Sequence, residues 1–151
     1  MKRRLADRLS DKFAVSPTGC WIWTAYTGPD GYGRISVNDR PMLAHRASYT
    51  VHVGPIPEGL VVDHKCHTPA CINPAHLRAI TQKQNIENRS GLSSNNRSGY
   101  RGVSYWAARS RWRAYVGGKS IGYFDTAREA GEAAAAARTE MFTHSDMDRS
   151  A

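Results

Sequence analysis

The stretch DHKCHTPACINPAHLRAITQKQN, residues 63–85, combines an Asp-His pair, a Cys/Cys/His pattern and a downstream asparagine within one short span. Hydrolysis of a phosphodiester needs a base for the attacking water, a cation for the developing charge and a rigid frame that holds both. The stretch supplies a candidate for each requirement. It therefore predicts a metal-dependent hydrolytic site built on a short strand, a metal-braced loop and a helix.

The overall charge of the chain favours a polyanionic partner. Its 151 residues include 21 Lys and Arg against 13 Asp and Glu, which gives a formal net charge of +8 and a pI near 9.8. A strongly basic balance is typical of proteins that bind nucleic acid. The length allows one domain or two small ones, and small modules often need a metal to supplement a thin core.

The basic residues are concentrated in one part of the chain. Between Arg89 and Phe124 there is no Asp or Glu, and the cations are Arg89, Arg97, Arg101, Arg109, Arg111, Arg113 and Lys119. Aromatic residues interleave with them, namely Tyr100, Tyr105, Trp106, Trp112, Tyr115 and Tyr123. A solvated basic face is one interpretation, but the aromatic side chains favour a nucleic-acid surface.

Cysteine count and hydropathy predict a soluble cytoplasmic protein. Three cysteines cannot all pair within one chain, and no signal-peptide pattern precedes them. The sequence also lacks an apolar run of the roughly eighteen residues that a membrane span requires. We therefore expect a reducing compartment and no membrane partner.

Strand-like and helical patterns alternate before residue 63. A short helix is expected over residues 5–13. Two strand-like runs, 20–26 and 31–37, are separated by turn residues and are expected to form an antiparallel pair. Residues 41–53 have helical spacing and end at a Gly/Pro-rich segment.

The metal-rich stretch itself is expected to begin on a strand and to end on a helix. VVDH, residues 61–64, predicts a short strand that enters the loop. Thr81 followed three residues later by Gln84 matches a capping box. A helix that begins there carries Asn85 in its first turn.

A Ser/Asn/Gly-rich segment separates the two halves of the chain. Beyond it, three β-like runs precede an Ala-rich helix at 126–142, which Thr126 and Glu129 would cap. The sequence therefore predicts an α+β protein in five parts: a basic segment at 1–18, a metal-braced domain at 19–90, a linker at 91–98, a three-stranded sheet packed on one helix at 99–143, and a frayed tail at 144–151.

The cysteines and one histidine form a complete ligand set for structural zinc. Cys66, Cys71 and His76 are spaced by four intervening residues each, and Cys20 lies far upstream. Three sulfurs and one imidazole suit a tetrahedral zinc, although the spacing differs from common zinc fingers. His67 is an alternative ligand. The competing interpretation is a pair of buried free cysteines with a surface histidine.

His64 is the candidate general base. A neutral imidazole can take a proton from water near pH 7. Asp63 and Asn85 offer hard oxygen donors suited to Mg²⁺. Because adjacent strand residues point to opposite faces, Asp63 and His64 can serve one centre only if the strand ends or twists between them, so Asn85 ranks above Asp63 as a ligand.

This constellation resembles the HNH endonucleases of the His-Me finger, or ββα-metal, superfamily, in particular the homing endonucleases of phages and introns. The segment HLRAITQKQN, residues 76–85, is similar to the closing part of their motif. The resemblance implies a ββα-metal fold, with His64 as base and with Asp63 and Asn85 as Mg²⁺ ligands. At the central position of the motif this chain has His76, for which we expect a zinc role, while Asn73 is expected to shape a turn.

The zinc pattern resembles the His-Cys box homing endonucleases, in which an upstream cysteine completes the tetrahedron. That resemblance implies Cys20, Cys66, Cys71 and His76 as zinc ligands. It also implies that Arg34 stabilises charge on the scissile phosphate, although a surface arginine is an equal alternative. His45 and Arg46, in a segment similar to phage HNH proteins, are expected to give packing and phosphate contacts.

The C-terminal part resembles an APETALA2-type DNA-binding domain in its YRGV segment, its Trp112 strand, its GYFDT turn and its Ala-rich helix. The resemblance implies that the sheet enters the major groove of double-stranded DNA. Ser104 and Gly117 stand where family members often have Arg, so the base code is not carried over. The expected contacts are Arg101, Tyr105, Trp106, Arg111, Trp112, Arg113 and Lys119.

Together these patterns predict a homing-type DNA endonuclease with catalytic Mg²⁺ and structural Zn²⁺. One active site per chain predicts that a monomer nicks one strand and that a double-strand break needs a homodimer or two successive events. The alternatives are a DNA-binding regulator with a non-catalytic zinc scaffold and a nonspecific nuclease. Retention of Asp63, His64 and Asn85 favours the enzyme.

Overall fold

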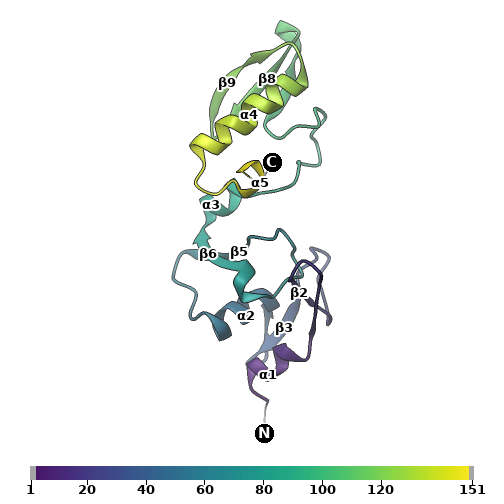
Figure 1. The fold of residues 1–151 in the computed structure, drawn as a ribbon, viewed down its shortest axis with the longest axis vertical. Coiled ribbons are helices and arrows are strands. Elements are labelled where there is room, and N and C mark those ends of the chain that lie inside the picture. The colour runs from purple at the N-terminus through teal and green to yellow at the C-terminus, as the bar shows by residue number, and fades with distance from the viewer. Residues whose placement is uncertain (1–2, 150–151) are drawn as a thin grey trace. The chain divides into compact units, whose positions relative to one another are not determined.

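The chain forms two compact units that divide between Gln82 and Lys83. A computed structural model describes residues 3–149 (Figure 1). The first unit contains α1 (Leu5–Ser10), β1 (Phe13–Val15), β2 (Trp21–Trp23), β3 (Arg34–Val37), β4 (Arg40–Leu43), α2 (Ala44–His52), β5 (Leu60–His64), the 3₁₀ turn η1 (Pro74–His76) and β6 (Leu77–Thr81). The second contains nearly all of α3 (Gln82–Glu87), then β7 (Val103–Trp106), the 3₁₀ turn η2 (Ala107–Arg109), β8 (Arg111–Val116), β9 (Lys119–Phe124), α4 (Ala127–Met141) and α5 (Asp146–Arg149).

Two hairpins replace the single strand pair expected before residue 40. β2 pairs with β1, and β3 pairs with β4, both antiparallel. The expectation that β2 and β3 pair with each other was wrong, because only an isolated bridge from Thr27 to Gly33 joins their flanks. The predicted helix is shorter than 5–13 because Phe13 begins β1.

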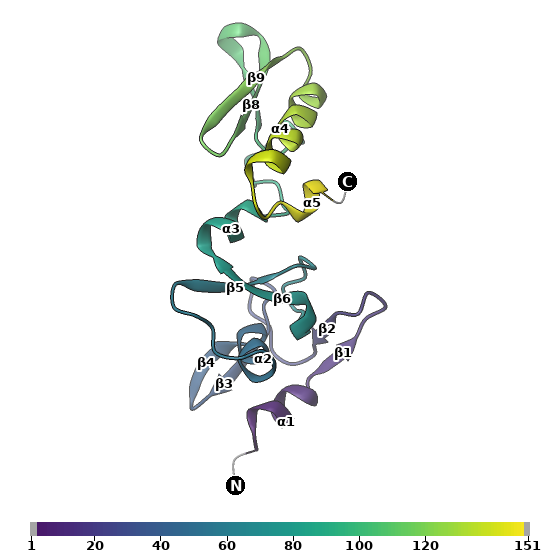
Figure 2. The ribbon, with the colours of Figure 1, turned by 60° about the vertical axis from the view of Figure 1, so that its left-hand side comes forward.

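The core of the first unit lies where α2 meets the β3–β4 hairpin (Figure 2). Its buried members are Leu9, Trp23, Ile35, Ala44, Ala47 and Ile72. Gly33 allows this close packing, since a Cβ atom there would lie 2.6 Å from the Trp23 ring. The helix expected over 41–53 begins only at Ala44, because the preceding residues form β4.

The strand predicted at VVDH is confirmed, and it carries the first two candidate catalytic residues. β5 pairs with β6 in antiparallel register, which sets Asp63 opposite Arg78 and His64 opposite Leu77. Both residues lie within the paired strand, which ends only after His64, so no strand end between them meets the condition for the two adjacent residues to serve one centre. β5, β6 and α3 follow one another in the order of a ββα motif.

The second unit is a three-stranded antiparallel sheet, in the order β7-β8-β9, covered by α4 (Figure 1). Thr126 and Glu129 form the predicted capping box at the start of α4. Val103, Ala114, Val116, Ala130 and Ala134 form its core. The frayed tail expected after residue 143 was wrong for the described part, because α5 packs against α4 through the buried Arg138–Asp148 ion pair.

The α+β fold prediction is confirmed: small antiparallel sheets and helices make up both units. Among residues 3–149, none of the helices has the length and apolar character needed to cross a lipid bilayer.

Candidate metal centre and active site

Four side chains from distant parts of the first unit meet in one cluster. Cys20, Cys66, Cys71 and His76 place their ligand atoms within 4.8 Å of one another. The Nδ1 atom of His76 lies 3.5 Å from the Cys20 sulfur and 3.7 Å from the Cys71 sulfur. A tetrahedral zinc separates its sulfur and nitrogen ligands by about 3.5 Å, as Zn–S and Zn–N bonds of about 2.3 and 2.0 Å require. The cluster therefore fits that ion.

The loop that carries these ligands is fastened on two sides. The Ile72 amide donates to the Trp21 carbonyl of β2, and the Ser48 hydroxyl of α2 donates to the Ile72 carbonyl at 2.6 Å. Asn73 forms the predicted turn, because its side chain accepts from the Ala75 amide and donates to the Gly19 carbonyl. Hydrogen bonds therefore hold the ligand loop to β2 and α2, and Ile72 of that loop lies in the hydrophobic core.

The cysteines differ in acidity. Burial raises the pKa of Cys71 to about 12, because the thiolate would lose its hydration. Burial acts in the same direction on Cys20, but hydrogen bonds from Thr18, His76 and the neighbouring thiols outweigh it and lower that pKa to about 7. A bound cation would deprotonate both thiols, since thiolates are the metal-binding form.

His64 is buried at the end of β5, with 6% of its surface exposed. Its Nε2 atom lies 2.8 Å from the Cys71 carbonyl oxygen. Because a carbonyl only accepts, Nε2 carries the hydrogen, and in the neutral ring Nδ1 is the basic nitrogen. Burial lowers the pKa of His64, although the hydrogen bond to Cys71 partly offsets that effect. The ring is therefore held neutral and oriented by the metal-ligand loop itself.

His45 and Tyr32 complete an aromatic cage around His64. The His45 and His64 ring centroids lie 4.6 Å apart, and the Tyr32 centroid lies 5.3 Å from that of His45 and 5.8 Å from that of His64. Burial and the neighbouring His64 lower the pKa of His45 to about 3. Its Nδ1 atom is buried without a hydrogen-bond partner. His45 was expected, together with Arg46, to give packing and phosphate contacts, and the sequence offers no signal that it adjoins the candidate base.

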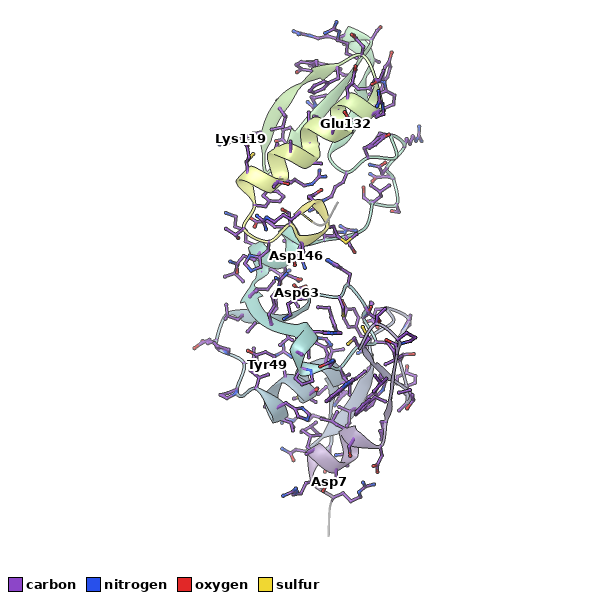
Figure 3. The ribbon with its side chains drawn as sticks, viewed as in Figure 1. Asp7, Tyr49, Asp63, Lys119, Glu132 and Asp146 are labelled. Carbon is purple, nitrogen blue, oxygen red and sulfur yellow. The ribbon has the colours of Figure 1, made fainter. Side chains whose placement is uncertain are left out.

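The two proposed Mg²⁺ ligands occupy different units. Asp63 lies on β5 (Figure 3), where one of its carboxylate oxygens accepts from Arg78 at 3.0 Å. Asn85 lies on α3, half-buried, in the second unit. Carboxylate and amide oxygens are donors that Mg²⁺ accepts, so the donor chemistry fits that cation.

The remaining site candidates of the first unit have individual surroundings. The Arg34 guanidinium pairs with Asp30 at 2.9 Å. Arg46 is half-buried on α2, next to His45. His67, the alternative zinc ligand, lies outside the four-residue cluster and has a left-handed backbone with φ of 52°.

One face of the second unit carries a cation–aromatic ladder, which we define as Trp106, Arg109, Arg113, Tyr115 and Tyr123. The Arg109 guanidinium lies 5.2 Å from the Trp106 ring centroid and 5.3 Å from that of Tyr123. Arg113 lies 5.8 Å from Trp106 and 5.4 Å from Tyr115. Stacked in this way, the arginines present charge on a preorganised apolar platform.

The ladder includes only part of the predicted DNA-binding set. Trp112 packs toward the core of the second unit and contacts Tyr105, with ring centroids 5.1 Å apart. Arg111 forms an ion pair with Asp125, and Lys119 is exposed at the start of β9 (Figure 3). Arg109, Tyr115 and Tyr123 belong to the basic and aromatic run noted in the sequence, but they were not among the expected DNA contacts. Strand alternation along β8 separates Arg113 and Tyr115 from Trp112, and this signal was available.

Arg101 differs from the other predicted DNA contacts because its guanidinium is used within the protein. It donates to the backbone carbonyls of Ile86, Glu87 and Arg89 at 3.2, 3.1 and 2.5 Å. These carbonyls lie at the C-terminal end of α3, where helical carbonyls lack intrahelical partners.

Comparison with known proteins agrees with this geometry. Residues 42–86, which include the His45–His64 pair, Cys66, Cys71 and His76, match the family described as HNH endonuclease. The chain is 33% identical over 82 residues to the uncharacterized gene 5.3 protein of Enterobacteria phage T3. The aligned region covers 50% of this chain and 81% of that protein. The chain therefore carries an HNH endonuclease domain and belongs to the same family as the T3 protein.

Two proteins of Escherichia phage T7 are also similar. Protein 7.7 is 43% identical over 68 residues, which is 45% of this chain and 52% of that protein. Protein 2.8 is 32% identical over 83 residues, which is 54% of this chain and 56% of that protein. The chain thus spans about half the length of each T7 relative. No solved structure matches the chain.

Proposed function

We propose that this chain is a site-selective DNA endonuclease of homing type, in which the first unit cuts and the sheet of the second unit selects the site. The observation that carries the proposal is the tautomer and orientation of the His64 ring, which lies within the matched HNH segment. Its Nε2–H is fixed by the Cys71 carbonyl, so Nδ1 is the nitrogen that can accept a proton. A structural scaffold would not require a neutral, oriented histidine at that position.

In the proposed reaction, His64 Nδ1 takes a proton from a water molecule that attacks phosphorus in line with the leaving 3′ oxygen. The cage of Tyr32 and His45 holds the ring and keeps bulk water from it. Arg34 and Arg46 are proposed phosphate contacts, for which Arg34 must exchange Asp30 for DNA. The products carry a 5′ phosphate and a 3′ hydroxyl.

The proposed cation is a single Mg²⁺ held by Asp63 and Asn85. When bound, it stabilises the charge that develops on the leaving oxygen. The Asp63 carboxylate forms an ion pair with Arg78 at 3.0 Å, so the cation would share that carboxylate with the guanidinium.

Cys20, Cys66, Cys71 and His76 are the proposed ligands of a structural zinc. Four protein ligands leave no open position for water, so this ion would brace the loop rather than take part in hydrolysis. Metal analysis of the purified protein should give one zinc per chain, and Cys66→Ser should lose it. A protein that is folded and metal-free would contradict the zinc assignment.

The proposed DNA partner is double-stranded, contacted through Trp106, Arg111, Arg113 and Lys119, with Arg109, Tyr115 and Tyr123 added from the ladder. A monomer with one site nicks, and a homodimer would make a double-strand break. The similarity to phage proteins supports action on DNA in the cytoplasm of the host cell.

A nicking assay tests the proposal against the alternative, a DNA-binding regulator with an inactive zinc scaffold. Supercoiled plasmid is incubated with the protein in Mg²⁺ and, separately, in EDTA. The endonuclease converts the plasmid to the relaxed form only with Mg²⁺. A regulator binds the plasmid in both conditions and leaves it supercoiled. Mapping the cut positions on a long DNA then separates a site-selective enzyme from a nonspecific nuclease.

A further inference from the structure

The helix that carries Asn85 is built into the second unit. Directly after Asn85 and the exposed Ile86, Glu87 and Asn88 are buried, with exposed fractions of 7% and 2%. The Thr143 hydroxyl donates to Glu87, and the Asn88 side chain accepts from the backbone amide of Asp146, a residue of α5 that Figure 3 labels. The HNH match extends to residue 86, so the last helix of the nuclease segment packs with the sheet unit.

Arg101 is the centre of this attachment. Its guanidinium donates to three carbonyls at the end of α3, as given above, and its own carbonyl accepts from Arg138 at 2.9 Å. Arg138 is in turn held by two bonds to Asp148 of α5, at 2.8 and 2.6 Å. A continuous polar chain therefore runs from α5 through α4 to the end of α3. A six-residue helix is marginal without such support.

We propose that Arg101 is a positioning residue for Asn85, the proposed metal ligand on α3. The inference rests on the proposed function, because it takes Asn85 as a Mg²⁺ ligand. It reassigns Arg101 from a DNA contact to a cap on α3. A lysine cannot replace it, since one ammonium group lacks the planar fork that spans several carbonyls.

The test is the Mg²⁺ dependence of single-turnover nicking by the full-length chain. Arg101→Ala and Arg101→Lys should each raise the half-saturating Mg²⁺ concentration by about tenfold, the usual effect of removing the support of a metal ligand. DNA affinity measured in EDTA should change by less than about twofold, since the guanidinium does not contact DNA in this assignment. The matched control is Arg128→Ala, an exposed arginine of α4 paired with Glu132, which should leave the Mg²⁺ curve unchanged.

Each outcome has a distinct meaning. A DNA-contact role predicts the opposite pattern: weaker binding in EDTA for Arg101→Ala, rescue by Arg101→Lys and an unchanged Mg²⁺ curve, which would overturn the inference. A purely structural role predicts a lower unfolding temperature with an unchanged Mg²⁺ curve, which would overturn it as well. If Arg101→Ala does not fold, the Arg101→Lys variant alone decides. Absence of nicking by the wild-type chain overturns the proposed function and this inference together.

Discussion

At the scale of single residues, the proposed hydrolysis rests on His64. Its burial places the ring beside His45 and Tyr32, and its hydrogen bond to Cys71 selects the tautomer. Both effects come from tertiary packing. The sequence identified His64 through its neighbours Asp63 and Asn85, whereas the basic nitrogen and the caging ring of His45 could be known only from the fold.

The lowered pKa of His64 has a consequence for the pH profile. A general base works only when unprotonated, and burial moves its pKa below the ordinary 6.5. Cleavage should therefore persist to more acidic pH than for an exposed histidine. We expect the acidic limb of kcat/KM against pH, at saturating Mg²⁺, to have its midpoint below 6.5. A midpoint above that value would show that the ring is solvated or that another group is the base.

His45 should make folding stability depend on pH. Its pKa of about 3 lies below the ordinary 6.5, so between these values the unfolded chain binds a proton that the folded chain does not. Stability is therefore lost as pH falls below 6.5, by up to about 1.4 kcal/mol per pH unit. Urea unfolding of wild type and His45→Phe at pH 7.5 and 5.5 should show a smaller loss in the variant. Equal losses would mean that His45 is hydrated when folded.

At the scale of elements, the sequence predicted the second unit more accurately than the first. β8, α4 and the Thr126 capping box follow from local patterns, because alternation and capping chemistry act over a few residues. The hairpin of β3 and β4 was missed although Asn38 and Asp39, with φ of 51° and 60°, form a two-residue turn of a type these residues favour. The pairing of β1 with β2 includes a side-chain contact, the stacking of Phe13 on Trp21, that the local pattern does not predict.

Gly131 of α4 provides a test of how the helix packs on its sheet. Alanine is the better helix former, but a Cβ atom at this position would overlap the Tyr100 ring. Gly131→Ala should therefore destabilise the protein by about 1–3 kcal/mol, as overpacking does. Ala136→Gly, at an exposed position of the same helix, removes only propensity and should cost about 1 kcal/mol. Thermal unfolding followed by circular dichroism would measure both, and a stabilised Gly131→Ala would refute the contact.

At the scale of the whole molecule, the proposed function assigns cutting to the first unit and DNA binding to the basic second unit. The formal net charge of +8 predicts general affinity for DNA, while the ladder concentrates cations on one face. The sequence predicted two modules and a basic second half, because composition and residue spacing carry that information. The attachment of α3 to the second unit depends on contacts between residues far apart in sequence, such as Glu87 and Thr143.

Replacement of Arg113 should separate binding from chemistry. Arg113→Ala removes a cation stacked between two aromatic rings and should weaken DNA binding by about tenfold. The slope of the logarithm of the binding constant against the logarithm of the salt concentration should become shallower by about the amount that one phosphate contact contributes. The nicking rate at saturating protein should change little, because Arg113 lies outside the hydrolytic site. Fluorescence anisotropy at several salt concentrations would measure the first two effects, and an unchanged affinity would exclude the ladder from the DNA interface.

The most direct measurement is single-turnover nicking by His64→Ala in Mg²⁺, with DNA binding recorded in parallel. The control is His144→Ala, which replaces a half-buried histidine of the second unit. We predict that His64→Ala loses at least about a hundredfold in rate while its DNA affinity is retained, since removal of a general base costs about that factor or more. His144→Ala should cut at the wild-type rate. Cutting by His64→Ala at near the wild-type rate would contradict the account, because the oriented imidazole would then not be the base.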